Sequence, residues 1–299
     1  MTRFEIRVPE RELNLPLCVS CGQVFRWRRI EEDVWAGADG QDGYVCRRSL
    51  GGWEVTTNAD ERSFRRLFQL DRRLRDVEES IVALAPELAP YVARLPGLRL
   101  MRPRCAREVL FSFLCTSNNN LERITRMVGW LGDLGEPIAG LPVRAFPPLE
   151  RLALLDEEEL RGAGFGYRAR TIVAVARRLT ELGGDWLDRL RGVPYGEAHA
   201  CLRELPGVGP KVADCVCLIG LHFDEAAPID THLWQAACRL FFPEWTGKAL
   251  TEARYLQVGQ ALRERFGPLT GWAHQYLFYD NLLRWRAHSS PERADTLVP

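Results

Sequence analysis

The spacing of hydrophobic residues divides the chain into two parts that predict different secondary structure. Up to about residue 100, short runs of aromatic and β-branched residues are separated by Gly, Asp and Asn, a pattern typical of strands joined by hairpins. The predicted strands cover residues 22–27, 34–37, 43–47 and 52–57. Phe64, Leu67 and Phe68 then recur at helical spacing within residues 59–70. We therefore expect an antiparallel sheet covered by helices on one face.

From residue 102 onward the hydrophobic period is helical. Apolar stripes between Gly and Pro breaks predict helices over residues 105–118, 121–134, 149–155, 169–182, 195–202, 212–221, 255–266 and 271–285. Asp230 is expected to cap the start of a further helix, and the tail from Ser289 is expected to fray. The predicted fold class is α+β, with an N-terminal antiparallel sheet domain over residues 1–100 and a mostly α-helical domain over residues 101–299.

The composition suits a folded protein and excludes several classes. The 299 residues are 46% hydrophobic and 27% charged, with no formal net charge. Extensive disorder and a uniformly basic surface are therefore not expected, although a local basic face is compatible with these numbers. No apolar run approaches the roughly 20 residues of a membrane span, and residues 1–7 lack the core of a signal peptide. We expect no membrane partner and a bacterial cytoplasmic location, with the nucleus as the alternative.

Nine cysteines are scattered along the chain, and their spacing does not suit a metal. Two pairs are closely spaced: Cys18 with Cys21, and Cys215 with Cys217. The cysteines between them do not supply the second pair of a four-cysteine site. Cys215 and Cys217 cannot share one face of a helix, and only Cys238 follows, which is too few ligands for an iron–sulfur cluster. The sequence predicts free thiols and neither a metal nor a cofactor.

Lysine is rare in this chain, because only Lys211 and Lys248 among the 40 basic residues are not arginine. An amine can lose its proton and attack a carbon, whereas a guanidinium stays charged. A coding bias toward arginine explains the rarity of lysine equally well. The residues around each lysine must therefore show whether its amine has a function. Lys248 has no neighbouring motif and fits the bias.

Lys211 ends a Gly/Pro hairpin, the segment Leu-Pro-Gly-Val-Gly-Pro-Lys at residues 205–211. Gly207 and Gly209 expose backbone N–H groups ahead of a helix start, where anions bind. With a helix on each side this is a helix-hairpin-helix, which grips a DNA phosphate without reading sequence. Asp230 follows nineteen residues later. Taken singly, Lys211 is explained as a surface lysine and Asp230 as a simple N-cap; together with the hairpin they favour a lysine/aspartate glycosylase.

Several further motifs make the chain resemble a known family. They are Cys-Gly-Gln-Val-Phe-Arg-Trp at 21–27, Phe-Ser-Phe-Leu-Cys-Thr-Ser-Asn-Asn-Asn at 111–120, Gly-Tyr-Arg-Ala-Arg at 166–170, Pro-Ile-Asp at 228–230 and Gly-Trp-Ala at 271–273. With the hairpin they resemble the helix-hairpin-helix DNA glycosylase superfamily and, more narrowly, the 8-oxoguanine DNA glycosylases. The resemblance covers nearly the whole chain. It implies a sheet-bearing N-terminal domain and two helical subdomains with double-stranded DNA in the cleft between them.

The activity implied by the resemblance is base excision repair of an oxidised purine, 8-oxoguanine opposite cytosine, after the nucleotide is flipped out of the stack. Lys211 matches the family's nucleophile, which attacks C1′, displaces the base and leaves a Schiff base that permits β-elimination. Asp230 matches the carboxylate that stabilises cationic character at the sugar. The enzyme would thus be a DNA glycosylase with AP lyase activity.

Base recognition is also implied by matching residues. Gly22 matches the glycine whose carbonyl accepts a hydrogen bond from N7–H of 8-oxoguanine, a group that guanine lacks. Phe278 and Cys217 match the pair that sandwiches the flipped base, and Cys215 of the same motif is a further candidate. Without the resemblance, Gly22 passes for a turn glycine and the others for core residues. The family commonly has glutamine after Gly-Trp-Ala, but here the residue is His274, so base specificity is expected to be broader or to rest more on Gly22.

Contacts with DNA follow from three motifs. Asn118, Arg123 and Arg168 match residues that read the cytosine left behind, and Tyr167 matches the wedge in the vacated stack. His232 matches a histidine near a DNA phosphate, although by itself it is a first-turn helix residue. Three consecutive asparagines inside a predicted helix have no evident structural reason, because Asn disfavours helix interiors. The run therefore favours the DNA-reading interpretation.

Two alternatives stay open. A glycosylase of the same superfamily for another damaged purine generally lacks the lysine. A non-catalytic helix-hairpin-helix DNA-binding protein needs the hairpin, but neither Lys211 with Asp230 nor an aromatic base pocket. We expect a monomer, as in the family, acting on double-stranded DNA that contains an oxidised purine.

Overall fold

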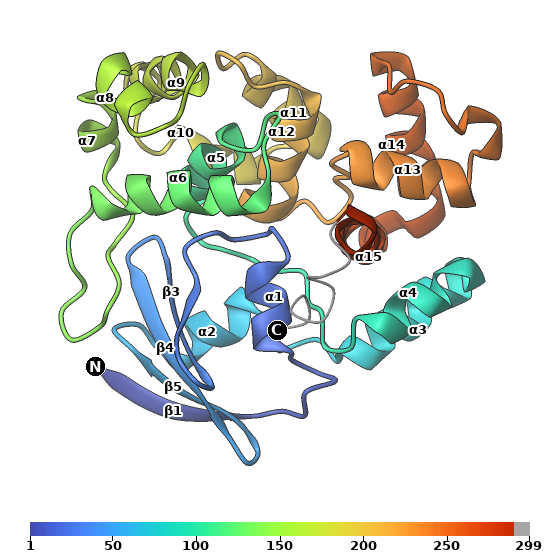
Figure 1. The fold of residues 1–299 in the computed structure, drawn as a ribbon, viewed down its shortest axis with the longest axis horizontal. Helices are drawn as coiled ribbons and strands as arrows, with labels where there is room; N and C mark the ends of the chain where they lie inside the picture. Colours follow the sequence, from blue (N-terminus) through green and yellow to red (C-terminus); the bar gives the residue numbers. More distant parts are fainter. Residues whose placement is uncertain (290–299) are drawn as a thin grey trace.

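A five-stranded antiparallel sheet forms the N-terminal part of the computed structural model, which describes residues 1–289 (Figure 1). Its strands are β1 (Thr2–Arg7), β2 (Arg28–Glu31), β3 (Val34–Asp39), β4 (Asp42–Ser49) and β5 (Gly52–Thr57). Their order across the sheet is β1-β5-β4-β3-β2, so the first strand pairs with the last. The strands predicted over residues 34–37, 43–47 and 52–57 are confirmed, whereas the hydrophobic pattern did not predict β1.

Residues 22–27 are not a strand, and this prediction is wrong. The segment runs irregularly between α1 (Leu15–Ser20) and β2, which pairs with β3 only from Arg28 onward. Gly22 has a φ of +87°, which breaks extended backbone. Trp27 instead lies flat on Gly37, where a Cβ would stand 2.1 Å from the indole. The aromatic residues of this segment therefore anchor a loop to the sheet rather than forming part of a strand.

Helices α1 and α2 (Glu61–Leu67) cover one face of the sheet, as expected. Phe64 of α2 packs edge-on against Phe4 and Tyr44, with ring centroids 6.1 and 5.7 Å away. Leu15 and Cys18 of α1 belong to the same buried hydrophobic cluster. This cluster is distinct from the larger one that fills the helical part of the protein.

The helices beyond the sheet form two groups (Figure 1). The first group contains α5 (Ala106–Leu114), α6 (Leu121–Asp133), α7 (Leu149–Ala153), α8 (Glu157–Gly162), α9 (Arg168–Leu182), α10 (Trp186–Arg189), α11 (Tyr195–Arg203) and α12 (Pro210–Cys215), which a π-helical turn at Val216–Gly220 continues. The second contains α3 (Leu74–Leu84), α4 (Ala89–Arg94), α13 (Thr231–Leu240), α14 (Glu252–Phe266) and α15 (Thr270–Ser289). Short 3-10 turns occupy Pro86–Leu88, Leu190–Gly192, Pro243–Trp245 and Gly267–Leu269.

Each helix predicted from residue 105 onward is present, with ends shifted by a few residues. Asp230 caps α13, as predicted. Helices α3 and α4 precede residue 100 but pack against α14 and α15 of the second group. Among residues 1–289 no helix combines the length and the apolar character that crossing a membrane requires. The expected fraying from Ser289 falls, apart from that residue's backbone, outside the described residues.

The three consecutive asparagines lie in the turn between α5 and α6, not inside a helix, so that expectation is wrong. Asn118 has a φ of +46°, a conformation that asparagine adopts more readily than most residues. Asn119 donates to the Cys115 carbonyl at 2.9 Å. Asn120 caps α6 by accepting from the Arg123 amide at 2.9 Å. Each asparagine has a local structural role, so the run does not by itself indicate contact with DNA.

A buried ion pair fastens the irregular segment before β2 to helix α5. Arg26 Nε and Nη2 donate to the two carboxylate oxygens of Glu108 at 2.8 and 2.6 Å, and only 7% and 10% of the two side chains are exposed. Glu108 Oε2 also accepts from the Gly40 amide at 2.9 Å, and Arg26 Nη1 donates to the Arg144 carbonyl at 2.7 Å. Because both charged groups are paired and hydrogen-bonded, the pair tolerates burial. It fixes the segment that carries Gly22 against the helical part.

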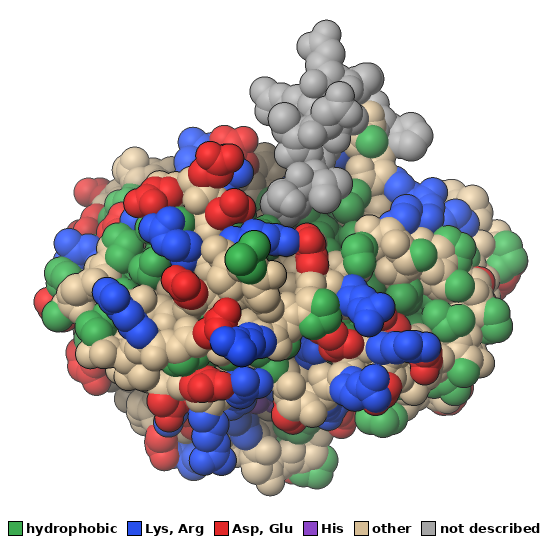
Figure 2. Space-filling model, turned by 90° about the horizontal axis from the view of Figure 1, so that it is seen from below, with side chains coloured by type: hydrophobic (Ala, Val, Ile, Leu, Met, Phe, Trp, Pro, Cys, Tyr) green, Lys and Arg blue, Asp and Glu red, His purple; other side chains and the backbone are tan. Residues whose placement is uncertain are grey.

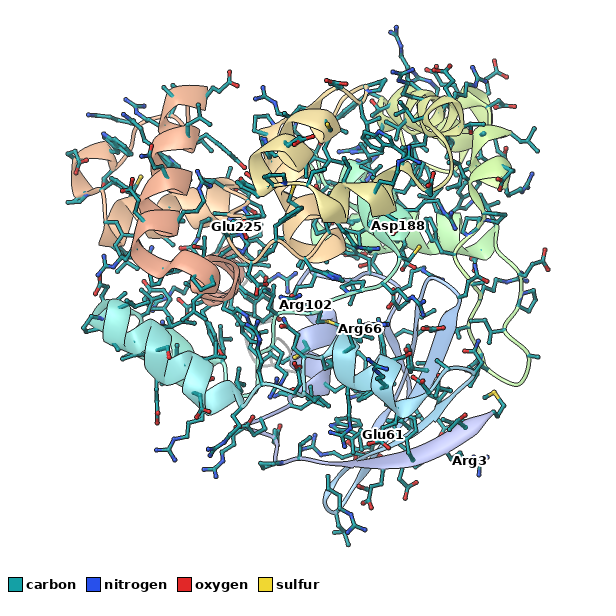
Figure 3. The ribbon with its side chains drawn as sticks, turned by 180° about the vertical axis from the view of Figure 1, so that it is seen from behind. Arg3, Glu61, Arg66, Arg102, Asp188 and Glu225 are labelled. Carbon is teal, nitrogen blue, oxygen red and sulfur yellow. The ribbon has the colours of Figure 1, made fainter. Side chains whose placement is uncertain are left out.

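Two further arginines fasten the connection from the sheet to the helices. Arg102 lies where the sheet part meets the helical groups (Figure 3), and its Nη2 donates to both carboxylate oxygens of Asp224 at 2.7 Å. Arg99 is 1% exposed and donates to the Gln69 carbonyl at 2.6 Å and to Glu12 Oε2 at 3.0 Å.

Acidic and basic side chains are also interspersed over the face seen from the sheet end (Figure 2), as expected for a chain without formal net charge. Arginine thus stabilises the junctions inside the fold as well as the surface.

Replacing Glu108 by Gln is expected to lower the free energy of unfolding by about 3 kcal/mol, because Arg26 is left as an uncompensated buried charge. Urea denaturation measures this change. Glu157→Gln is the matched control, because Glu157 pairs with Arg161 on the surface, where an ion pair contributes about 1 kcal/mol or less. Equal effects of the two substitutions would contradict the structural role of the buried pair.

Candidate active site

A cavity of about 380 Å³ opens where the two helical groups meet the irregular segment before β2. Its size is in the range of small-molecule sites. Seven of the candidate residues predicted from the sequence line it: Gly22, Lys211, Cys215, Asp230, His232, His274 and Phe278. They come from four separate segments of the chain, so only the folded protein brings them together.

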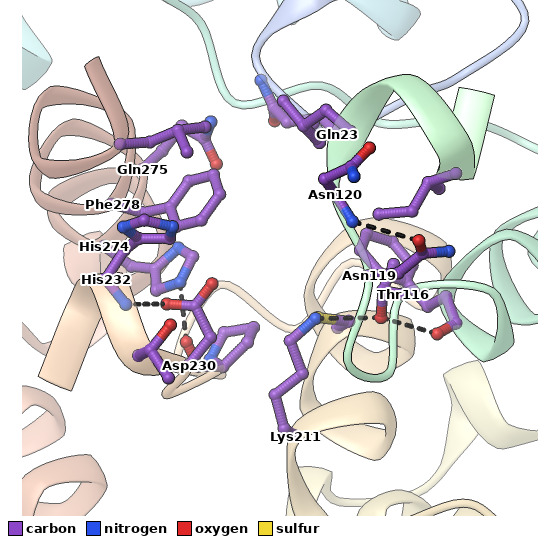
Figure 4. Close-up of a pocket in the computed structure, with 18 of the residues that line it drawn as sticks. Gln23, Thr116, Asn119, Asn120, Lys211, Asp230, His232, His274, Gln275 and Phe278 are labelled. Atoms are coloured by element: carbon purple, nitrogen blue, oxygen red, sulfur yellow. Dashed lines mark hydrogen bonds between the residues drawn. The ribbon is translucent and has the colours of Figure 1, made fainter. Parts of the chain in front are cut away.

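Lys211 enters the cavity from the first turn of α12 (Figure 4). Its Nζ donates to Thr116 Oγ1 at 3.2 Å and lies 5.3 Å from the centroid of the Phe113 ring. Gly209 is the N-cap residue of this short helix, and Pro210 occupies its first position. The amine therefore lies in a partly apolar cavity, where the Thr116 hydroxyl and the Cys215 thiol are its hydrogen-bonding neighbours. The sequence reasoning did not single out Thr116 and Phe113, although both stand in the motif at 111–120, three positions apart.

Asp230 faces the same cavity from the start of α13 (Figure 4). Its Oδ1 accepts from the backbone amides of His232 and Leu233, both at 2.9 Å. The described residues supply no hydrogen bond to Oδ2. One oxygen of the carboxylate thus caps the helix, and the other is available to a bound molecule.

Cys215, and not Cys217, lines the cavity, which corrects the assignment of Cys217 to the base-binding pair. Cys215 lies four residues after Lys211 and therefore on the same face of the helix. Cys217 is fully buried in the hydrophobic cluster and is absent from the lining. The helical period alone separates the two cysteines, because residues two apart cannot face one way. Burial raises the pKa of the Cys215 thiol to about 11 although Lys211 opposes it, so the side chain stays neutral near pH 7.

His274 is held by the segment that precedes Asp230. Its Nε2 lies 2.8 Å from the Pro228 carbonyl oxygen, which can only accept, so Nε2 carries the hydrogen. Nδ1 is buried and has no hydrogen-bond partner among the described residues. Burial lowers the pKa of His274 to about 4, so the imidazole is neutral near pH 7. Its ring is parallel to the Phe278 ring, with an interplanar angle of 3° and centroids 5.9 Å apart.

His232 packs its ring edge-on against Phe278 and Trp285, at centroid distances of 6.0 and 5.7 Å. Its Nδ1 lies 3.4 Å from Asn281 Nδ2. Asn281 Oδ1 accepts from Arg239, which fixes the amide so that its nitrogen faces His232. Nδ1 therefore accepts and Nε2 carries the hydrogen. Burial lowers the pKa of His232, which favours this neutral form.

Gly22 lies beside Phe278 at the edge of the cavity. A Cβ at this position would stand 3.7 Å from the Phe278 ring and 3.3 Å from Leu121. The φ of +87° is a conformation that side-chain-bearing residues rarely adopt. Glycine is thus required by the backbone, and it also leaves the space next to Phe278 open.

The four residues expected to read the cytosine or to fill the vacated stack lie together outside the cavity: Asn118, Arg123, Tyr167 and Arg168. Asn118 lies in the turn between α5 and α6, Arg123 in the first turn of α6, and Tyr167 and Arg168 at the start of α9. Tyr167, with 55% of its surface exposed, donates to the Ser117 carbonyl at 3.0 Å. Arg123 donates to the Gly164 carbonyl at 2.8 Å. The arrangement presents an exposed aromatic ring next to a polar turn.

Arg168 is more deeply placed than its expected role suggests. It is 3% exposed, and its guanidinium donates to the Ser117 carbonyl and, at 3.0 Å, to that of Asn118. It also lies 4.6 Å from the centroid of the Tyr167 ring. In this structure Arg168 fixes the turn. Its contact with a cytosine stays a prediction, and such a contact requires the guanidinium to exchange some of these hydrogen bonds.

The predicted hairpin connects α11 to α12, as expected for a helix-hairpin-helix. Gly207 has a φ of +70°, and a Cβ there would stand 2.6 Å from the Thr171 side chain, so glycine is needed on both counts. Gly209 has no neighbouring atom within 4 Å of the corresponding position. Both glycines are exposed. The hairpin backbone is therefore accessible to a phosphate group.

The cysteines carry no disulfide, and all nine are free thiols, as the sequence predicts. Among residues 1–289, no group of three or more His, Cys, Asp or Glu side chains is arranged to hold a metal ion. The chemistry available in the cavity is that of an amine, a carboxylate and two neutral imidazoles.

Comparisons with known proteins identify the family of the chain. Residues 5–106 match the 8-oxoguanine DNA glycosylase N-terminal domain, and residues 111–260 match the HhH-GPD superfamily base excision DNA repair proteins. The chain is 35% identical to N-glycosylase/DNA lyase OGG1 of Arabidopsis thaliana, over 93% of this chain and 80% of that protein. It is also 35% identical to the N-glycosylase/DNA lyase of Saccharomyces cerevisiae, over 92% of this chain and 85% of that one.

A solved structure is similar over the same length. The Clostridium acetobutylicum 8-oxoguanine glycosylase/lyase, in complex with double-stranded DNA containing cytosine opposite 8-oxoguanine, superposes with a TM-score of 0.79 at 25% identity and covers 94% of this chain and 93% of its own. Sequence and fold are thus similar over nearly the whole chain. The chain belongs to the HhH-GPD superfamily of base excision DNA repair proteins, in the group that carries the 8-oxoguanine DNA glycosylase N-terminal domain.

Proposed function

We propose that the protein is a bifunctional DNA glycosylase and AP lyase that removes 8-oxoguanine, opposite cytosine, from double-stranded DNA. The observation that carries the proposal is that Lys211 and Asp230 face one cavity that Phe278 and Cys215 also line. The names of the relatives support it, because they are N-glycosylases with DNA lyase activity.

The flipped base would enter between Phe278 and Cys215, whose neutral side chains suit an aromatic ring. Gly22 borders the open space beside Phe278, and its carbonyl would accept from N7–H of 8-oxoguanine. Guanine has no hydrogen at N7 and would leave this carbonyl unpaired, which costs about 1–3 kcal/mol. One backbone acceptor would thus separate the damaged base from the normal one.

The chemistry follows from the amine and the carboxylate. The Lys211 amine attacks C1′ while the bond from C1′ to N9 breaks, and the base leaves with the electron pair and takes up a proton. Opening of the sugar ring then gives a Schiff base, and loss of a C2′ proton expels the 3′ phosphate. The free oxygen of Asp230 would stabilise positive charge on the sugar during the first step. Thr116 would hold the amine until the substrate arrives.

His274 limits the hydrogen bonds that the cavity can offer to the base-pairing edge of the flipped base. With its hydrogen donated to Pro228, the ring can offer only the lone pair of Nδ1. A glutamine at this position offers both a donor and an acceptor. We therefore propose that selectivity in this protein rests mainly on Gly22.

The two alternatives have less support. A glycosylase of the same superfamily for another purine would not need the Lys211 amine in its cavity. A non-catalytic DNA-binding protein would need neither that amine nor the aromatic wall at Phe278. The expected monomeric state and the cellular location stay predictions.

Lys211→Gln is expected to abolish the covalent protein–DNA adduct that borohydride traps on a duplex containing 8-oxoguanine opposite cytosine, because Gln cannot form a Schiff base. Gel electrophoresis measures the adduct. Lys248→Gln is the matched control, since it removes the other lysine of the chain and should leave trapping unchanged. Trapping that persists in Lys211→Gln would disprove the assignment of the nucleophile.

Asp230→Asn is expected to slow base release by about 10²–10³-fold, because the sugar loses its electrostatic partner. Asn caps helices as well as Asp does, so the thermal midpoint and the affinity for an abasic duplex should change little. Single-turnover kinetics separate the two effects. A normal rate of release with Asn at this position would exclude a catalytic role for the carboxylate.

His274→Gln is expected to shift selectivity toward 8-oxoguanine relative to formamidopyrimidine lesions, because the amide adds a donor to the pocket. The ratio of the two excision rates measures the shift in the wild type and the variant. Since the pKa of His274 is about 4, the shift should not depend on pH near neutrality. Identical selectivity in both proteins would contradict a role of this residue in reading the base.

A further inference from the structure

Side chains fix all three residues that lead into α13, two of them through other residues and the third through its own carboxylate. The Pro228 carbonyl accepts from His274 Nε2 at 2.8 Å, and Asp230 Oδ1 accepts two backbone amides of α13. Between them, the Ile229 amide donates to the Tyr255 hydroxyl at 3.5 Å. Ile229 is 1% exposed, and a buried amide requires a partner. Among the described residues Tyr255 supplies the only hydrogen bond to this amide.

Tyr255 connects this segment to the helix that carries Lys211. Its hydroxyl hydrogen is donated to Asp214 Oδ2, which leaves the oxygen free to accept from Ile229. Asp214 is 2% exposed and lies three residues after Lys211 on α12. The connection from Asp214 through Tyr255 to Ile229 therefore runs from the helix of the amine to the residue next to the catalytic carboxylate.

This connection spans the two helical groups. Helix α12 belongs to the first group, whereas α13 and α14 belong to the second (Figure 1). Burial raises the pKa of Asp214, and the hydroxyls of Tyr195 and Tyr255, together with His199 3.8 Å away, oppose this by favouring the carboxylate. A hydrogen bond in a buried, low-dielectric environment is electrostatically stronger than one in water. The Asp214–Tyr255 bond is thus suited to holding the two groups in a fixed register.

We propose that Asp214 and Tyr255 are positioning residues that set the separation between the Lys211 amine and the Asp230 carboxylate and thereby control the rate of base release. The proposal rests on the function proposed above. Neither residue lines the cavity, so they act through Lys211 and Asp230 and not on the substrate. A displacement of about 1 Å between reacting groups lowers a rate by up to about 100-fold, so the effect of a loosened connection is measurable.

The same carboxylate provides a matched control. Tyr195 donates to Asp214 Oδ1 at 2.6 Å, but it has no contact with Ile229. Tyr255→Phe and Tyr195→Phe each remove one hydroxyl from Asp214, and only the first breaks the connection to the segment before Asp230. If the network served stability alone, the two substitutions would act alike.

The experiment compares wild type, Tyr255→Phe and Tyr195→Phe in three measurements. These are the single-turnover rate of base release from an 8-oxoguanine:cytosine duplex, the affinity for a duplex with an abasic analogue, and the exchange of the Ile229 amide with deuterium. For Tyr255→Phe we expect a rate about 10- to 100-fold lower, unchanged affinity and faster exchange. For Tyr195→Phe we expect the wild-type rate and wild-type exchange.

Equal rates in all three proteins, or equal losses in both variants, would overturn the proposal. Unchanged exchange at Ile229 in Tyr255→Phe would also overturn it. If the wild type itself releases no base from this duplex, the proposed function fails independently. The exchange of Ile229 then decides whether the connection exists, because that measurement requires no activity.

Discussion

The Asp230 carboxylate uses one oxygen for the fold and keeps the other free for the proposed chemistry, and the arrangement of the cavity depends on this division. The first amides of a helix have no partner within the helix, and Oδ1 satisfies two of them at the start of α13. The side chain is therefore fixed before any substrate binds, with its other oxygen directed to the cavity. A carboxylate on a flexible loop would have to be ordered at each encounter, which costs conformational entropy.

The start of a helix also positions Lys211. It stands in the first turn of a short helix whose entry is a hairpin that only glycine can form at Gly207. Lys211 and Asp230 are thus both attached to helix starts, one in each helical group. The walls of the cavity come from distant segments, and buried polar contacts such as Arg26 with Glu108 keep those segments in place. Hydrophobic clusters stabilise each part, but directional contacts determine how the parts meet.

The sequence predicted most of this fold because long amphipathic helices and hairpins have a clear period. It failed for residues 22–27, where aromatic side chains anchor a loop to the sheet. It also failed for the asparagines, because the first apolar stripe was extended to Asn118, whereas α5 ends at Leu114. The prediction that Lys211 and Asp230 act together came from a motif, and both residues line the same cavity.

Cys217 was assigned wrongly to the cavity, although counting four residues along the helix from Lys211 would have selected Cys215. The pairing of Tyr255 with Asp214, 41 residues apart, has no local signal, and only the packing of α14 reveals it.

The scarcity of lysine has a practical consequence for the study of this protein. Apart from the N-terminal amine, the chain offers a reagent only two primary amines, and they lie in different surroundings. Lys248 is exposed on the surface, whereas Lys211 is partly buried in the cavity. An amine-selective label would therefore modify Lys248 first, and a molecule that occupies the cavity would shield Lys211. The protein thus contains a built-in probe of occupancy, with an internal reference on the same chain.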